Sequence, residues 1–108
     1  MRIWLSVSHD RFCLSPPFPA RMRTGWVCMI STQLQQAVER FDEVVSQDQP
    51  DFPISGLKAP SVIRIARLAV VAADSLVGAV GEIGPERLQT IRHKIADWIQ
   101  GTIPIAQS

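Results

Sequence analysis

The chain has 108 residues, of which 46% are hydrophobic and 19% are charged, a composition typical of one globular domain and not of a disordered chain. Eleven lysines and arginines face ten aspartates and glutamates, and a formal net charge of +1 excludes a strongly basic protein that coats nucleic acid. Two cysteines, Cys13 and Cys28, are too few for a disulfide scaffold and lack the spacing of a zinc site. We therefore expect reduced thiols in a cytosolic protein, with no metal site and no cofactor.

Positive charge is concentrated at the start of the chain. Residues 1–24 contain four arginines and one aspartate, residues 25–60 two cations and five carboxylates, and residues 61–108 five cations and four carboxylates. The basic first segment is therefore the one place where composition suggests a polyanionic ligand, although composition alone favours a solvated loop whose arginines serve solubility. A membrane span is not expected, because the most apolar stretch, residues 62–80, contains three charged residues.

The first half of the chain predicts two strands and a long loop. Residues 3–7 alternate between apolar and polar side chains, which indicates a short half-buried strand. Residues 9–24 contain three prolines and predict a long loop. Residues 26–30 are apolar and uncharged and predict a buried strand. Residues 34–45 are ambiguous: their apolar side chains recur at helical spacing, whereas residues 41–45 alone also fit a short strand.

The second half predicts further strands. Residues 46–60 contain three prolines and a glycine without periodicity, which is typical of a loop. Residues 61–65 and 68–71 are apolar and rich in β-branched side chains, so both are expected to be strands. Residues 77–83 include two glycines, which favours a bulged or tightly curved strand.

A C-terminal helix is the clearest element. Pro85 suits the first helical position after Gly84, and Gly101 suits the end of the helix. The apolar residues between them recur on one face, which comprises Leu88, Ile91, Ile95, Trp98 and Ile99. Together the elements predict a small α+β domain.

Four stretches of the chain, residues 26–33, 55–64, 78–88 and the helix that continues in register through residue 99, resemble the MazF/PemK family of ribonuclease toxins. Residues 26–33 (WVCMISTQ) resemble the family's strand that ends in a Ser/Thr-rich turn, and residues 55–64 (SGLKAPSVIR) its mid-chain signature. Residues 78–88 (GAVGEIGPERL) resemble the segment that leads into the C-terminal helix. The resemblance extends over about residues 26–101 and includes the order of the stretches.

The resemblance implies both a fold and an activity. The fold is an SH3-like β-barrel with a C-terminal α-helix, formed by residues 1–108 as a single toxin-like domain. The activity is that of the toxin of a bacterial type II toxin–antitoxin system, a cytoplasmic homodimer that a cognate antitoxin binds. It is a metal-independent endoribonuclease that cuts single-stranded RNA, including mRNA. The ribose 2′-OH attacks the adjacent phosphate and leaves a cyclic phosphate and a 5′-OH.

The resemblance also implies the site residues. The catalytic hydroxyl corresponds to Ser31, with Thr32 as the close alternative, and Gln33 follows in the RNA-facing turn. In the family an Arg-Pro pair begins the second strand; Arg2 matches this arginine, with Ile3 in place of the proline. We therefore expect Arg2 and Ser31 to be catalytic, and Thr32, Gln33 and Arg11 to bind RNA. A guanidinium and a hydroxyl suit this chemistry, because both stabilise negative charge that develops on a phosphate.

Two parts of the family's fold have no match in this chain on this alignment, and their lack leaves alternatives open. On this alignment the chain lacks the family's first strand and the loop that closes over the active site, so a truncated chain, a misassigned start and a decayed copy are alternatives. A non-catalytic relic that retains antitoxin binding or dimerisation therefore stands beside the ribonuclease. A weaker third interpretation is a toxin of similar fold that poisons a topoisomerase. The family also places residues 34–40 in a loop and residues 41–45 in a strand, and we follow it there.

Overall fold

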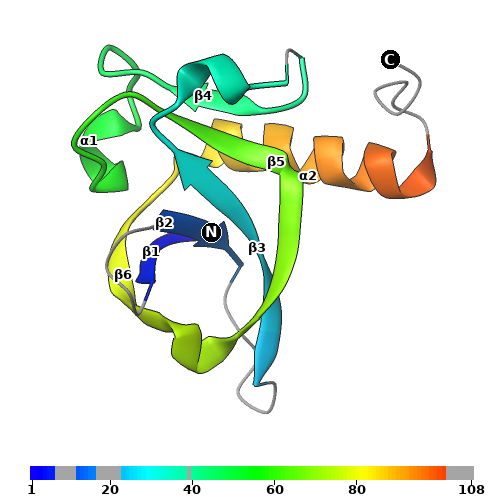
Figure 1. Ribbon diagram of the computed structural model, residues 1–108. Coiled ribbons are helices and arrows are strands. Elements are labelled where there is room, and N and C mark those ends of the chain that lie inside the picture. The colour runs from blue at the N-terminus through cyan, green and yellow to red at the C-terminus, as the bar shows by residue number, and fades with distance from the viewer. Residues whose placement is uncertain (7–11, 17–22, 39, 102–108) are drawn as a thin grey trace.

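The protein consists of a curled antiparallel sheet and a C-terminal helix (Figure 1). A computed structural model describes residues 1–6, 12–16, 23–38 and 40–101. The strands are β1 (Arg2–Ser6), β2 (Phe12–Ser15), β3 (Thr24–Ser31), β4 (Glu43–Val45), β5 (Ser61–Ala72) and β6 (Leu76–Glu82). They lie in the order β4-β5-β3-β2-β1-β6, and the sheet curls into a half-barrel. The predicted α+β class, with a barrel-like sheet and a C-terminal helix, is confirmed.

The N-terminal part differs from the prediction in one strand. Strands β1 and β3 confirm the two that the apolar patterns indicate. The expected loop over residues 9–24 is wrong in part, because it contains β2, which pairs with β1 on one side and β3 on the other. Cys13 and Leu14 of this strand are buried in the core. The strand has only four residues, too few to show a period, and the prolines follow it at Pro16.

Residues 34–45 form a turn and a strand. The 3₁₀ turn η1 (Leu34–Gln36) is followed by β4, so the choice of loop plus strand is confirmed and the amphipathic helix is wrong. Arg40 has a φ of 68°, which ends any helical path before the strand. Leu34 is 41% exposed whereas Phe41 is buried, so side chains at helical spacing here do not share one buried face.

Strand β5 is longer and less regular than the two strands expected. It runs without interruption through residues 61–72, and its pairing with β3 jumps from Cys28↔Leu68 to Met29↔Arg64. Three residues, Ile65, Ala66 and Arg67, therefore have no partner on β3. This bulge of three residues bends β5 where the strand passes α2 in Figure 1.

The predicted loop over residues 46–60 contains a single helical turn, α1 (Phe52–Ser55). Its backbone lies directly against β6: a Cβ on Gly81 would fall 2.2 Å from the Ser55 carbonyl carbon, and one on Gly56 would fall 2.2 Å from the Val80 oxygen. Glycine at both positions permits this close approach. Strand β6 also shifts register against β1, as expected for a curved strand that contains glycines.

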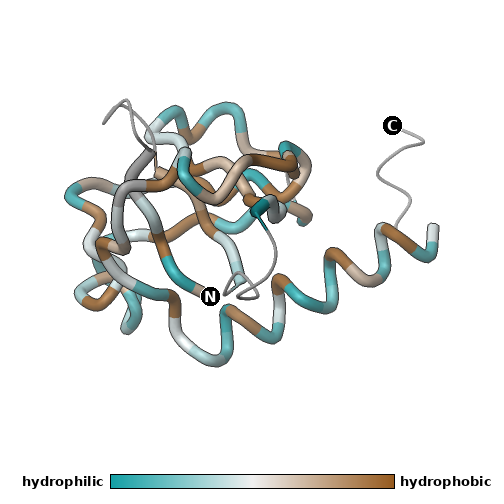
Figure 2. The backbone as a smooth tube through the Cα atoms, turned by 90° about the horizontal axis from the view of Figure 1, so that it is seen from below, coloured by the Kyte–Doolittle hydropathy of each residue, from teal (hydrophilic) through white to brown (hydrophobic). Residues whose placement is uncertain are grey.

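The helix α2 (Pro85–Gln100) confirms the predicted element, with Gly84 at its N-cap and Gly101, at a φ of 76°, at its C-cap. Ile91 and Ile95 are buried against the sheet, and Leu88 and Trp98 pack on the core from the side. Ile99 was expected on the buried face but is 77% exposed. Figure 2 shows why: the last turns of α2 extend beyond the sheet. Among the described residues no helix is long and apolar enough to cross a membrane.

A polar cluster fixes the start of α2 on the sheet. Arg87 donates to Asp51 Oδ2 at 2.7 Å and to the carbonyl oxygen of Val44 at 3.1 Å. Its guanidinium also donates to Gln49 and to Glu43, which in turn forms an ion pair with Lys94. Asp51 further accepts the Gly84 backbone N–H at 3.1 Å, so one carboxylate holds both the N-cap and the first turn of α2.

Substituting Asp51 by asparagine is expected to lower the free energy of unfolding at pH 7 by about 2 kcal/mol, because a charge-assisted hydrogen bond to Arg87 is weakened. The hydrogen bond from Arg87 holds the pKa of Asp51 below its ordinary value, and the Gly84 N–H adds to this effect. The stabilisation is therefore complete above the ordinary aspartate pKa and is lost as the pH falls toward the folded-state pKa. Urea unfolding from pH 7 to pH 3 should show the wild-type and variant stabilities converging; a difference that widens in acid would contradict this.

Candidate functional site

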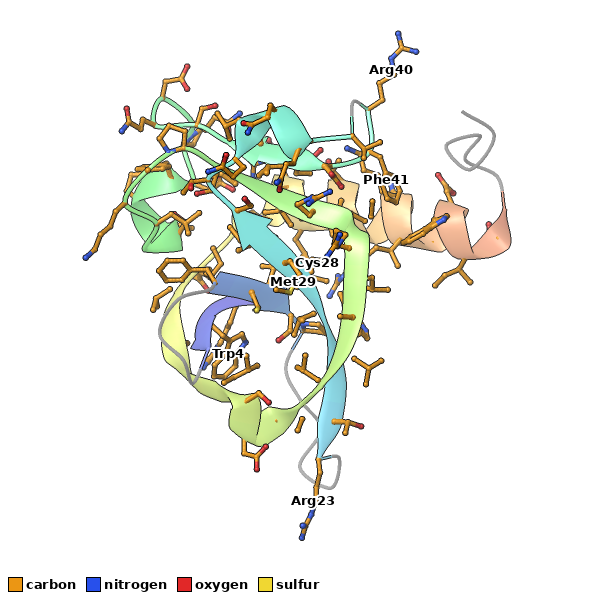
Figure 3. All side chains as sticks on the ribbon, viewed as in Figure 1. Trp4, Arg23, Cys28, Met29, Arg40 and Phe41 are labelled. Atoms are coloured by element: carbon orange, nitrogen blue, oxygen red, sulfur yellow. The ribbon has the colours of Figure 1, made fainter. Side chains whose placement is uncertain are left out.

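A pocket of about 510 Å³ lies where β3 ends and β5 bulges. Its apolar wall is formed by Phe12, Met29 and Ile30. Its polar wall is formed by Ser31, Thr32, Gln36, Arg64 and Arg67. The lining thus contains two cations, two hydroxyls and an amide, and none of its residues is a carboxylate. In Figure 3, Met29 marks this region near the middle of the sheet.

Ser31 is held by the turn that follows β3. It pairs with Val62 at the end of the β3–β5 ladder, and its Oγ accepts the backbone N–H of Gln33 at 3.0 Å. Such a serine turn fixes the hydroxyl oxygen and leaves the hydroxyl hydrogen to donate. Ser31 is half-buried and lines the pocket, so its free hydrogen is available to a ligand there.

The other residues of the turn divide between the pocket and the solvent. Thr32 lines the pocket beside Ser31, as expected. Gln33 is exposed and its Oε1 accepts Gln35 Nε2 at 2.8 Å, so this side chain is engaged within the turn and is not part of the lining. Gln36, which the sequence did not single out, lines the pocket instead.

Arg64 and Arg67 reach the same pocket because of the β5 bulge. In a regular strand, residues three apart face opposite sides of the sheet. The three residues without partners on β3 change that alternation, and both guanidinium-bearing side chains line one pocket. Arg67 is exposed, whereas the Arg64 side chain is only 19% exposed.

The guanidinium of Arg64 is oriented by two neighbours. Its Nη1 donates to Gln36 Oε1 at 3.0 Å, and its Nε lies 4.0 Å from Asp42 Oδ2. The Nε atom is buried and donates no hydrogen bond. Asp42 is fully buried at its side chain and accepts the backbone N–H groups of Val38 and Ala66, each at 3.0 Å.

The structure does not bring Arg2 to this pocket. Arg2 pairs with Ser15 of β2 and with Glu82 of β6, whereas Ser31 follows Ile30, which pairs with Phe12 at the other end of β2. Strand β2 lies between them, and three residues along a strand correspond to about 10 Å. The resemblance matches Arg2 to the arginine that begins the family's second strand, but the second strand of this chain is β2, and the residue directly before β2 in the sequence is Arg11. Arg11 itself lies outside the described residues.

The polar groups that line the pocket are hydroxyls, an amide and two guanidinium groups. The described residues hold no group of three or more His, Cys, Asp or Glu side chains arranged to bind a metal ion. Cys28 precedes the pocket residue Met29 in β3, and burial, with smaller effects of Asp42 and Cys13, raises the pKa of its thiol to about 12. The thiol is therefore protonated at neutral pH and is not a nucleophile.

A second pocket, of about 390 Å³, lies at the start of α2 between Gln49 and Arg87. Its one cation, Arg87, is already bound to Asp51, which also accepts the Gly84 N–H. This pocket is therefore part of the packing of α2 and offers no unoccupied cation or hydroxyl comparable to those at the end of β3.

Comparison with known proteins identifies the fold. No family model matches the sequence, and no curated protein matches it. Among solved structures, the Mycobacterium tuberculosis toxin MazF-mt6 is similar, with a TM-score of 0.71 and 14% sequence identity. The match covers 93% of this chain and 97% of that chain, so almost the whole of the neighbour has an equivalent here. The chain therefore has a MazF-like α+β fold.

Proposed function

We propose that this chain is the toxin of a type II toxin–antitoxin pair and cuts single-stranded RNA without a metal ion. The fold of a MazF toxin supports the general class. The observation that carries the proposal is the pocket at the end of β3, where the Ser31 hydroxyl and the guanidinium groups of Arg64 and Arg67 line one wall. Such a pocket suits a phosphodiester, whose non-bridging oxygens accept hydrogen bonds and carry negative charge.

In the proposed reaction the ribose 2′-oxygen forms a bond to the adjacent phosphorus while the bond from phosphorus to the 5′-oxygen breaks. The 2′-OH loses its proton and the departing 5′-oxygen gains one, which gives a cyclic phosphate and a 5′-OH. Ser31 donates its free hydroxyl hydrogen to a non-bridging oxygen, and Arg64 stabilises the charge that increases in the transition state. The 2′-OH requirement accounts for cleavage of RNA and not of DNA.

The remaining lining suits RNA binding. Arg67 is exposed at the pocket and pairs with a neighbouring phosphate, and Thr32 adds a second hydroxyl. Phe12 is half-buried in the apolar wall and offers a ring edge or face on which an unpaired base stacks. Arg11 precedes Phe12 in the sequence and stays a predicted RNA-binding residue. Gln33, which is exposed in the turn and does not line the pocket, also stays a predicted RNA-binding residue. A homodimer and a cognate antitoxin in the bacterial cytoplasm complete the proposal, because the fold neighbour is a toxin.

The decisive experiment incubates the purified protein with a long single-stranded RNA in EDTA and maps the cut ends, beside the Ser31→Ala and Ser31→Thr variants. We expect discrete cuts with 5′-OH ends. Ser31→Ala should lower the cleavage rate by about 100-fold or more, the scale of a lost hydrogen-bond donor to oxygen atoms that gain charge in the transition state. Ser31→Thr keeps a hydroxyl at the same position and should retain most of the rate.

Two results would overturn the proposal. Cleavage by Ser31→Ala at the wild-type rate would remove Ser31 from the site. No cleavage by a folded wild-type protein would favour the alternative, a non-catalytic relative that retains antitoxin binding or dimerisation.

A further inference from the structure

At the β5 bulge, the backbone of β5 lacks the hydrogen-bond partners that a regular ladder with β3 would provide. Ile65, Ala66 and Arg67 have no partner on β3, so their N–H groups must find acceptors elsewhere. The Ala66 N–H donates to Asp42 Oδ1 at 3.0 Å. Asp42 lies 24 residues earlier in the chain, so the bulge is supported by a side chain from a different segment.

Asp42 joins the bulge to the loop before β4. Its second oxygen, Oδ2, accepts the Val38 N–H at 3.0 Å, so the carboxylate bridges the loop and β5. The side chain is fully buried, and both of its oxygens accept from backbone donors. A buried carboxylate with two backbone donors and a nearby cation is fixed in position much more firmly than a surface carboxylate.

The same carboxylate faces the pocket cation. Asp42 Oδ2 lies 4.0 Å from Arg64 Nε, and Gln36 Oε1 accepts Arg64 Nη1 on another side of the guanidinium. Within the described part of the chain, Arg64 Nη2 donates to no protein acceptor, so this nitrogen is left for a ligand. Asp42 therefore acts on Arg64 twice, through the bulge that carries the arginine and through its charge.

We propose that Asp42 is a positioning residue, which holds the β5 bulge and orients Arg64 toward the phosphate of the RNA. This inference rests on the proposed function. Asp42 touches no substrate, and its effect passes through Arg64. A guanidinium displaced by about 1 Å can cost on the order of 100-fold in rate, because catalysis depends on its placement at the transition state.

The test is the Asp42→Asn variant, which has the same size but a changed set of donors. An amide presents one acceptor and one donor, so either rotamer leaves Val38 or Ala66 without its acceptor, and the charge opposite Arg64 is lost. We expect kcat for RNA cleavage to fall on the order of 10- to 100-fold while KM is essentially unchanged. Asp51→Asn is the matched control: it makes the same substitution at a carboxylate that is 9% exposed and lies outside this pocket, and it should leave kcat of the folded protein unchanged.

A double variant separates positioning from general destabilisation. If Asp42 acts through Arg64, adding Asp42→Asn to Arg64→Ala should cause no further loss of kcat, whereas a purely structural effect would multiply the two losses. All rates are measured at a temperature well below the thermal unfolding midpoint of each variant. Wild-type kcat in Asp42→Asn, or multiplicative losses in the double variant, would overturn the inference while leaving the ribonuclease intact.

A spectroscopic measurement on the wild-type protein does not depend on activity or on the folding of a variant. The ¹H–¹⁵N signal of Arg64 Nε should be resolved and protected from solvent exchange, because this atom is buried beside Asp42. An Arg64 Nε–H that exchanges as fast as that of exposed Arg92 would overturn the positioning role. If the wild-type protein cleaves no RNA, the proposed function fails, and this signal still decides whether Asp42 orients Arg64.

Discussion

Replacing Arg64 with alanine is expected to lower the rate of RNA cleavage by about 10²–10³-fold, the scale on which enzymes lose rate when one donor to a developing oxyanion is removed. The guanidinium lines the pocket with the Ser31 hydroxyl, is oriented by Gln36 and Asp42, and keeps Nη2 for a ligand. Single-turnover cleavage of a short RNA, with the protein in excess, measures this loss without interference from product release.

Three further variants make the result specific. Arg64→Lys keeps a positive charge opposite Asp42 but has no planar fork, so it should recover part of the rate at most. Arg92→Ala removes the same charge from the exposed face of α2 and should cleave normally. Arg11→Ala tests the arginine that directly precedes β2. Wild-type cleavage by Arg64→Ala together with an inactive Arg11→Ala would transfer the catalytic cation from Arg64 to Arg11.

The parts of the fold that the sequence predicts are those with a long or simple pattern. The C-terminal helix has both caps and sixteen residues of periodicity, and β3 contains the uninterrupted apolar run of residues 26–30. Strand β2 was missed because four residues cannot establish a period and the prolines after it dominate the composition of the segment. The helix pattern over residues 34–45 was produced by residues that belong to a turn, a loop and an edge strand.

The missed strand explains the misplaced arginine. Because the sequence predicts a loop where β2 lies, the resemblance matches Arg2, at the start of β1, to the arginine that begins the family's second strand. In the structure β1 is the first strand and pairs with both β2 and β6. Arg2 therefore lies away from Ser31. Ser31 directly ends the apolar run of β3, so its place at the end of this strand follows from local sequence, whereas its catalytic role comes from the family resemblance and stays a prediction.

Arg64, Gln36 and Asp42 could not be found in the same way. Arg64 stands inside a segment that the family resemblance singled out, but its direction depends on a three-residue bulge that no periodicity reveals. Asp42 contacts Ala66 from 24 residues away, and Gln36 contacts Arg64 from 28 residues away. Contacts at such separations follow from how β4 and the loop before it fold over β5, which is a property of the tertiary structure.

The loop before β4 links the stability of the domain to the pocket, because it carries both Phe41 and Asp42. Phe41 precedes Asp42, is 1% exposed, and its ring stands edge-on to Trp98 of α2 with centroids 5.2 Å apart and an interplanar angle of 81°. Figure 3 shows Phe41 between β5 and the helix. The side chain therefore joins the loop to the C-terminal helix, in the core that also contains Ile95.

Phe41→Ala is expected to lower the free energy of unfolding by about 3–5 kcal/mol, because a large buried side chain is replaced by a cavity. A small domain has a total stability of about 5–15 kcal/mol, so this single change should remove a large share of it. Urea unfolding measures the loss, and Ile99→Ala, which truncates a 77% exposed side chain on the same helix, should change stability by less than about 0.5 kcal/mol. Phe41→Leu fills most of the volume and should cost less than alanine. Equal losses in Phe41→Ala and Ile99→Ala would mean that the loop carrying Asp42 is not anchored on α2, and the rigid support proposed for Arg64 would lose its physical basis.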